Sequence, residues 1–498
     1  MKPDQPKNRR PASDRPNRRG PSSNGADRKE RSQDRGPQDD KPDLPDAFYS
    51  QDQLESATNL LTELEDKMKG LAARRGALDV LQRLRAGEPL DRALATTRTF
   101  SLLKGADRSF ARNLVALTLR RRGSLDHVIG IYLDRPLPAR AGEAMDILRM
   151  TGAQLYILGT PAHAAVATAT ELAGMKQELK GYKGLINAIC RRLSEKGKKH
   201  WDALPMRTDT PGWLWRRWER QYGLPIARAI AEAHRGEPPL DLTLRDPQAA
   251  EKLASQLGGI AFANGTVRLS SGNITTMPGF DEGKFWAQDL AASLPVIAMG
   301  DVKGKVIFDV CAAPGGKTMQ LAARGADVMA IDRSSSRLKT LHENMRRTKL
   351  RARSAAEDLL LWQPQEQADG LLLDAPCTAT GTLRRNPDIA WTRKDEDIEA
   401  LAHLQTRMID RAVTMVKPGG IFVYAVCSLQ KEEGEKQIEA ALARHGNLRL
   451  LPITAEELGG EVFAPLIAKQ GWLRTLPCHL KTLGGVDGFF IARMRVES

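Results

Sequence analysis

The stretch Val306–Arg333, VIFDVCAAPGGKTMQLAARGADVMAIDR, decides the fold. It opens with an apolar run, which is typical of a strand buried on both faces of a parallel sheet. Gly315 and Gly316 then allow a sharp turn and the close approach of a ligand. Helical spacing begins at Lys317, and a second apolar run ends in Asp332. This order predicts the first half of a nucleotide-binding α/β unit.

Two kinds of ligand fit this unit. A phosphate-binding P-loop would need a glycine five places before Gly316, and Cys311 stands there. An acidic residue at the end of the second strand suits a ribose diol, which both dinucleotides and S-adenosylmethionine contain. The alternative is a glycine-rich turn between strand and helix that binds nothing.

Two later strand-like runs end in cysteine. The run LLLD ends at Asp374 and leads to Cys377, and the run IFVYAV leads to Cys427. The carboxyl ends of parallel strands lie on one edge of the sheet, where ligands bind. We therefore expect Asp374, Cys377 and Cys427 to converge near the loop of Gly315 and Gly316.

Four segments together carry a family resemblance: DVCAAPGGKT, the strand-ending Asp332, DAPCTATGTLRRNPD and VCSLQKEEGE. In this order and spacing they resemble the Sun/Fmu family of RNA cytosine-C5 methyltransferases, and within it the branch that methylates small-subunit ribosomal RNA. The resemblance covers roughly residues 70–498. One departure is Val426, where the family usually has Thr or Ser. The resemblance implies an enzyme that uses S-adenosyl-L-methionine to form 5-methylcytosine in ribosomal RNA, 16S RNA in particular.

The same resemblance assigns roles to three side chains. Cys427 would add to C6 of cytosine, which turns C5 into a carbon that can attack a methyl donor. Cys377 would help to release the product, and Asp374 would hydrogen-bond N3 and N4 of the base. From the sequence geometry alone either cysteine could attack, because DNA cytosine methyltransferases use the cysteine of a Pro-Cys motif. The implied cofactor-binding residues are Cys311, Ala312, Ala313, Pro314, Gly315, Gly316, Lys317, Asp332, Asp358 and Asp374.

Composition narrows the class of protein. The 498 residues allow several domains, and the formal net charge of +14 favours a polyanionic partner. No apolar run has transmembrane length, and the hydrophilic start from Lys2 predicts no signal peptide. Five scattered cysteines indicate reduced thiols and a cytoplasmic location. We expect a monomer that binds RNA, no membrane and no metal, since no CxxC pair or suitably spaced histidines occur.

The N-terminal part divides into an arm and a helical domain. Residues 1–48 hold almost no large apolar residues, which predicts a disordered basic arm that either holds RNA phosphates loosely or is an incidental tail. Residues 49–205 show helical apolar spacing and resemble the NusB-like RNA-binding domain. The arginines Arg120, Arg121 and Arg122 either contact phosphates or form a solvated helix face, and the resemblance favours RNA.

The rest of the chain divides into three further segments. Residues 206–240 are predicted to be a linker with interleaved tryptophans and arginines, which either stack on bases or, as we prefer, anchor one domain on another. Residues 241–300 predict a small α/β RRM-like subdomain, and residues 301–498 a Rossmann-like class I methyltransferase domain. The fold class is therefore multidomain: all-α, then small α/β, then Rossmann-like α/β.

Two other classes of protein remain to be weighed. A non-catalytic RNA-binding or antitermination factor would fit the NusB-like half, but would have no use for two thiols at a cofactor site. A DNA cytosine methyltransferase would fit the Pro-Cys motif, but not the second cysteine and the helical domain. Methylation of another RNA, 23S or transfer RNA, stays an alternative within the leading interpretation.

Overall fold

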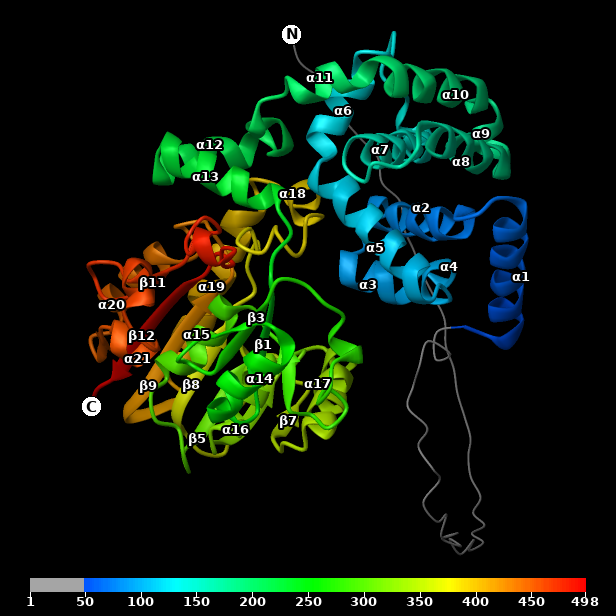
Figure 1. Cartoon of the computed structure of the whole chain (residues 1–498). Helices are drawn as coiled ribbons and strands as arrows, with labels where there is room; N and C mark the ends of the chain where they lie inside the picture. Colours follow the sequence, from blue (N-terminus) through cyan, green and yellow to red (C-terminus); the bar gives the residue numbers. More distant parts are fainter. Residues whose placement is uncertain (1–48) are drawn as a thin grey trace, which may run out of the picture. The chain divides into compact units, whose positions relative to one another are not determined.

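The computed structural model describes residues 49–498, which form a helical part, a small antiparallel sheet and a large mixed sheet (Figure 1). This order confirms the predicted fold class. The arm predicted for residues 1–48 lies outside the described residues. Within the described part, no helix combines the length and the apolar character needed to cross a membrane.

The helical part is built on one apolar core. Leu78, Leu114 and Leu148 are all buried there, in keeping with the helical apolar spacing of residues 49–205. Its first helix starts with a capping box in which Ser50 and Gln53 satisfy each other's backbone amides. The helices are α1 Gln51–Lys67, α2 Leu71–Arg85, α3 Leu90–Thr96, α4 Arg98–Ser101, α5 Gly105–Arg120, α6 Arg122–Gly130, α7 Gly142–Tyr156, α8 Ala162–Met175, α9 Gln177–Lys180, α10 Lys183–Arg192 and α11 Lys198–Asp202.

The arginines at the end of α5 are engaged inside the protein. Arg120 is buried and donates a hydrogen bond to the carbonyl of Arg384. Arg121 forms an ion pair of 2.7 Å with Asp209. The sequence favoured phosphate contacts for both arginines, and the structure instead commits them to internal contacts. The reason is that α5 ends against another part of the chain, where a buried guanidinium needs an acceptor.

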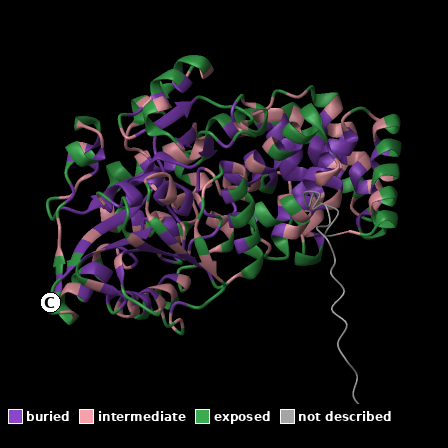
Figure 2. Cartoon of the chain, turned by 90° about the horizontal axis from the view of Figure 1, so that it is seen from below, coloured by how far each residue is buried: buried purple, intermediate pink, exposed green. Residues whose placement is uncertain are grey.

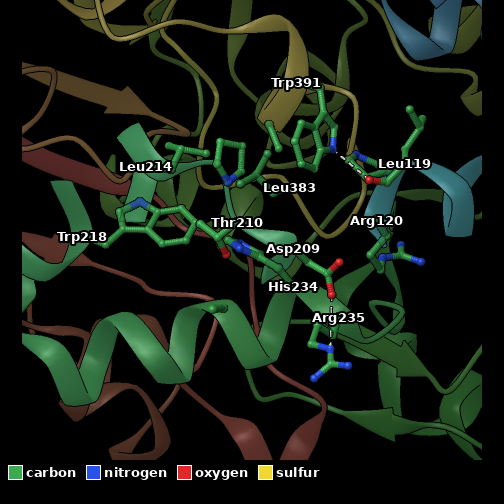
Figure 3. A pocket seen from close by; sticks show the side chains of 14 residues that line it. Leu119, Arg120, Asp209, Thr210, Leu214, Trp218, His234, Arg235, Leu383 and Trp391 are labelled. Atoms are coloured by element: carbon green, nitrogen blue, oxygen red, sulfur yellow. Dashed lines mark hydrogen bonds and ion pairs between the residues drawn. The ribbon is translucent and has the colours of Figure 1, made fainter. Parts of the chain in front are cut away.

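The segment predicted to be a linker is mostly helical. It contains the short 3-10 helix η4 Met206–Asp209, α12 Gly212–Tyr222 and α13 Leu224–Arg235. Trp218 of α12 is fully buried and packs with Leu383 and Leu429. Figure 3 shows Trp218, Leu214 and Leu383 around the small hollow that these helices share with Trp391 of the short helix α18 Ile389–Thr392. Trp218 therefore has the packing role that the sequence analysis preferred.

The small sheet is antiparallel throughout, with strand order β2-β3-β1-β4. The helix α14 Ala250–Leu257 covers it, because its buried Leu253 and Ala254 share a core with Val267 of β3. The sheet's strands are β1 Leu240–Leu244, β2 Ile260–Ala261, β3 Thr266–Leu269 and β4 Phe285–Ala287.

The large sheet has the order β10-β12-β9-β8-β5-β6-β7, with β11 paired to β12. The strands from β9 to β7 are parallel, and β12 runs antiparallel to β9. β11 pairs antiparallel with β12. Its strands are β5 Val306–Val310, β6 Asp327–Ile331, β7 Arg353–Ala355, β8 Ala368–Asp374, β9 Val416–Val426, β10 Leu448–Leu450, β11 Leu473–Arg474 and β12 Phe490–Val496.

Helices cover both faces of this sheet, so its central strands are buried (Figure 2). One face carries α15 Leu290–Ala298, α16 Gly316–Ala323 and α17 Ser335–Thr348, and the other carries α19 Asp397–Val413 and α20 Glu435–Arg444. The shorter helices are α18 Ile389–Thr392 and α21 Ala455–Leu458.

The position of α15 bears on the domain boundary. The predicted boundary after residue 300 stays a prediction, but α15 already packs on the large sheet through Leu290 and Leu294. The chain order reverses at β5, which has β6 on one side and β8 on the other. Ligands bind at such a switch point, beside the carboxyl ends of the strands.

Candidate active site

The glycine loop joins β5 to α16 at this switch point. Cys311 has a φ of 61° and Gly315 a φ of 102°, so the backbone turns sharply twice within the loop. A Cβ on Gly315 would lie 2.9 Å from Cγ of Leu341, which shows that only glycine fits here. Beneath the loop, burial raises the pKa of Asp309 to about 7, and Thr318 donates to its carboxyl group. The loop therefore rests on a buried acid whose pKa lies close to physiological pH.

Asp332 follows β6 and is buried beside the glycine loop. Its carboxylate accepts hydrogen bonds from the backbone amides of Ala313 (3.2 Å) and Ser334 (3.0 Å). Arg337 adds an ion pair of 3.1 Å, and its own side chain is 55% exposed. Three of the roughly four acceptor positions of a carboxylate are thus used, and one remains for a ligand.

Asp374 ends β8 and faces the same loop. Its carboxylate accepts a hydrogen bond of 2.7 Å from Nζ of Lys317, at the start of α16. Although burial opposes the charge on Lys317, Asp374 raises the pKa of this lysine. The ammonium group also lies 5.5 Å from the ring centre of Phe489. Lys317 is therefore a fixed cation that orients Asp374.

Cys377 and Cys427 meet at the ends of β8 and β9, with their sulfur atoms 3.5 Å apart. Backbone hydrogen bonds hold the two loops together, among them one of 3.0 Å from the Gly381 amide to the Cys427 carbonyl. The hydrogen bond with Cys427 and burial raise the pKa of Cys377. The Cys377 thiol is thus held in its protonated form, and Cys427 is the more exposed of the two.

The side chain of Glu433 connects the two loops that carry Cys377 and Cys427. Its buried carboxylate accepts hydrogen bonds from the amide and hydroxyl of Thr378, the hydroxyl of Ser428 and the side chain of Gln405. Thr378 and Ser428 each directly follow one of the two cysteines. Gln405 also donates a hydrogen bond of 2.8 Å to the Pro376 carbonyl. This carboxylate therefore fixes both cysteines relative to each other.

Sequence reasoning missed Glu433 and Gln405 as residues of the site. Glu433 stands in the polar run LQKEEGE, which has no apolar spacing to indicate burial. Its distance of six residues from Cys427 was the available signal, because a turn after a strand can fold back on the strand end.

A Glu433→Gln substitution is expected to lower kcat by about tenfold to a hundredfold, since small misplacements of reacting groups have effects of this size. An amide places two hydrogens where the carboxylate accepts them, so the cysteine loops shift while the substrate-binding surfaces stay. KM for RNA should therefore change little, which steady-state methyl transfer measures.

The matched control for this prediction is Glu432→Gln. Glu432 is the neighbouring residue, only partly buried, and pairs with Arg217 and Lys436 rather than with the cysteine loops. An equal loss of kcat in both variants would contradict the positioning role of Glu433.

Asp358 is the predicted site residue that follows the edge strand of the large sheet. It follows β7, is exposed, and accepts a hydrogen bond of 2.9 Å from the amide of Leu360. Within residues 49–498 no hydrogen bond joins it to the glycine loop. The other predicted residues lie in the glycine loop or beside it, as described above.

The basic stretch after Cys377 is buried in an ionic network. Arg385 pairs with Asp289 (2.6 Å) and Asp487 (3.0 Å), and Arg384 with Asp487 (3.2 Å). Burial opposes the charge of Asp289, but Arg385 and Arg384 together hold the pKa of its carboxyl group below the ordinary value. The buried ionic network consists of these four residues together with the pair Asp241 and Arg268 of the small sheet, 2.6 Å apart.

Comparison with known proteins agrees with this architecture. Residues 296–495 match the family described as 16S rRNA methyltransferase RsmB/F, and residues 71–195 match the NusB family. The chain is 35% identical over 369 residues to the ribosomal RNA small subunit methyltransferase B of Erwinia tasmaniensis, covering 69% of this chain and 84% of that protein. The protein of that name from Pasteurella multocida is 31% identical over 443 residues, covering 84% and 94%.

The solved structure of PH0851 covers 86% of this chain and 98% of its own, with a TM-score of 0.66 and 21% identity, and shares the fold. Fold and matched sequence together define a methyltransferase with a Rossmann-like sheet. The chain belongs to the 16S rRNA methyltransferase RsmB/F family, with a NusB domain at its N-terminal side. It is an RNA cytosine methyltransferase, as predicted.

Proposed function

We propose that this protein transfers a methyl group from S-adenosyl-L-methionine to C5 of a cytosine in 16S ribosomal RNA, with Cys427 as the nucleophile. The observation that carries the proposal is the pair of thiols 3.5 Å apart at the strand ends, beside Lys317 and Asp374. The relatives named ribosomal RNA small subunit methyltransferase B support the substrate.

The residues at the switch point fit S-adenosyl-L-methionine. Asp332 is buried and keeps an acceptor position for a ribose hydroxyl, and the half-exposed Arg337 can move to free a second one. Gly315 and Gly316 let the chain approach a ligand closely at the start of α16. Cys311, Ala312, Ala313, Pro314 and Lys317 would form the rest of this wall, and Asp358 the adenine side. The bound cofactor supplies an electrophilic methyl group on a sulfonium.

The residues of the chain would then act in sequence. Cys427 adds to C6 of the base, which makes C5 nucleophilic towards the methyl group. Asp374, oriented by Lys317, holds the edge of the base and offsets the charge that develops there. After transfer, the C5 proton passes to solvent water, and the bond from C6 to Cys427 breaks with its electron pair left on the Cys427 sulfur. Cys377, protonated and in contact with Cys427, assists this elimination.

The test is methylation of defined RNA by the full chain. Purified protein, S-adenosyl-L-methionine and 16S RNA should yield a cytosine that resists bisulfite conversion, and 23S RNA in the same reaction should not. A resistant cytosine in 23S or transfer RNA alone would contradict the proposed substrate. Conversion of every cytosine, with the cofactor bound, would contradict the activity.

An Asp332→Ala variant should bind S-adenosyl-L-methionine more weakly by about 1.5–3 kcal/mol, the size of a lost charged hydrogen bond. Calorimetric titration measures this, and Asp332→Asn, which keeps the volume, should show the same direction. The control is Asp327→Ala at the other end of β6, where the carboxylate is exposed and pairs with Arg353. Unchanged affinity in Asp332→Ala would remove Asp332 from the cofactor site.

A further inference from the structure

A second hollow lies among α6, α11 and α12, away from the strand ends of the large sheet (Figure 1). It has a volume of about 640 Å³, within the range of about 300–1,000 Å³ that ligand pockets span. Trp215 and Ile131 give it apolar surface, and Arg207 and Arg216 are exposed beside them. We call this hollow the Trp215 groove.

The charges of the Trp215 groove have one sign. Arg207 and Arg216 contribute guanidinium groups, and His127 and His200 contribute imidazoles. No Asp or Glu is among the described residues that line it. The acids next to it in sequence, Asp126, Asp202 and Asp209, are each in ion pairs with other basic side chains. The groove therefore presents uncompensated positive charge.

These arginines differ from the neighbouring ones. Arg121 and Arg217 are paired with carboxylates, whereas Arg207 and Arg216 form no ion pair with any residue in the range 49–498. The guanidinium carbon of Arg207 instead lies 6.0 Å from the ring centre of Trp215. An unpaired guanidinium beside a half-exposed indole suits a ligand that carries both a negative charge and a flat ring.

The tryptophans of the segment divide in the same way. Trp213 and Trp218 pack in the apolar cluster that contains Leu383 and Leu429, so their role is packing. Trp215 is only partly buried and lines the groove. The two interpretations of this segment, packing and base stacking, therefore apply to different tryptophans of the same run.

We propose that the Trp215 groove binds a single-stranded segment of the substrate RNA, with a base stacked on Trp215 and phosphates held by Arg207 and Arg216. The proposal rests on the RNA methyltransferase function and adds a second contact point for the substrate. Single-stranded RNA is bound elsewhere by the same combination of aromatic platforms and basic side chains.

The groove is also tied to the cysteine loops. The helix α12 that carries Trp215 packs Trp218 against Leu429, two residues after Cys427. Tyr222 at the end of α12 donates a hydrogen bond to the Leu429 carbonyl. RNA held in the groove would thus contact α12, which packs against the loop after Cys427. We therefore expect the groove to affect how the enzyme captures its substrate.

The test measures binding of a labelled single-stranded RNA of about ten nucleotides to the full chain, without cofactor, by fluorescence anisotropy. Trp215→Ala should weaken binding about tenfold, and Trp215→Phe should retain most of it, because stacking needs only an aromatic face. Arg216→Gln should lower the slope of log affinity against log salt by about 0.7, the value for one phosphate contact on a single strand.

Arg220→Gln is the matched control, since Arg220 is exposed on the same helix and does not line the groove. It should leave affinity and salt slope close to those of the unmodified protein. Equal effects of Arg216→Gln and Arg220→Gln, or unchanged binding in Trp215→Ala, would overturn the proposal. So would displacement of the RNA by polyglutamate as effective as by unlabelled RNA, because the groove would then bind polyanions of any kind.

Methyl transfer separates this proposal from the proposed function. Trp215→Ala should raise KM for RNA about tenfold, matching the lost stacking, while kcat at saturating RNA stays unchanged. If the protein binds RNA through Trp215 but methylates no 16S RNA, the groove proposal is correct and the proposed function is wrong. If methylation is normal but neither RNA binding nor KM depends on Trp215, the proposed function is correct and the groove proposal is wrong.

Discussion

A Cys377→Ala variant incubated with S-adenosyl-L-methionine and 16S RNA is expected to remain covalently attached to the RNA. Cys427 would still add to C6, but the thiol that lies 3.5 Å from it and assists elimination would be gone. A Cys427→Ala variant should form no adduct and transfer no methyl group, because no carbon–sulfur bond can form. A denaturing gel with labelled RNA distinguishes the two outcomes.

The control for this experiment is Cys478→Ala, since Cys478 is also partly buried but packs near Trp218, outside the catalytic pair. It should methylate normally and leave no adduct. An adduct from Cys427→Ala and none from Cys377→Ala would reverse the assignment and make Cys377 the nucleophile, as in DNA cytosine methyltransferases. Cys377 is buried whereas Cys427 is partly exposed, which argues against that reversal.

An Asp289→Asn variant is expected to lose about 3–5 kcal/mol of unfolding free energy, because removing one partner leaves buried arginines without compensation. Asp289 accepts from Arg385 and also from the backbone amides of Ala291 and Asp487. Calorimetry should show a lower midpoint for the transition that contains the large sheet. The transition of the helical part is followed separately, and its midpoint should not move.

Asp327→Asn is the control for this second prediction. The carboxylate of Asp327 is 56% exposed and pairs with the equally exposed Arg353, so its loss should cost less than about 1 kcal/mol. Similar losses in both variants would show that the buried ionic network contributes no more than a surface pair. A double variant of Asp289 and Arg385 should recover part of the loss, since it leaves fewer unpaired charges.

The catalytic fold could be predicted from the sequence because it follows from general rules of strand, turn and helix geometry. Apolar runs of strand length, a glycine loop and acids at strand ends were sufficient to expect the order of β5, α16 and β6. The rule that parallel strands end on one edge led to the expectation that Cys377 and Cys427 would converge. These features depend on local chain geometry, so they can be seen without knowledge of packing.

The burial of several charged residues could not be predicted from the sequence. Arg120 and Arg384 looked like a basic surface, and Glu433 like part of a solvated turn, yet all three are buried. Burial of a charge depends on partners distant in sequence, such as Asp487 for Arg384. A linear pattern records the charge but not the partner, so neither the buried ionic network nor the role of Glu433 could be predicted.

The short connection between the two sheets limits how the protein can be divided. Only Gln288 and Asp289 separate the last strand of the small sheet from α15, and both side chains are fixed by hydrogen bonds. The two sheets therefore cannot be separated as independent domains. A truncated chain that begins at residue 301 would lack α15 and expose the apolar face that Leu290 and Leu294 cover. Since α12 and α13 cover Leu383 and Leu429 in the same way, the smallest autonomous catalytic fragment should begin before α12, near Gly212.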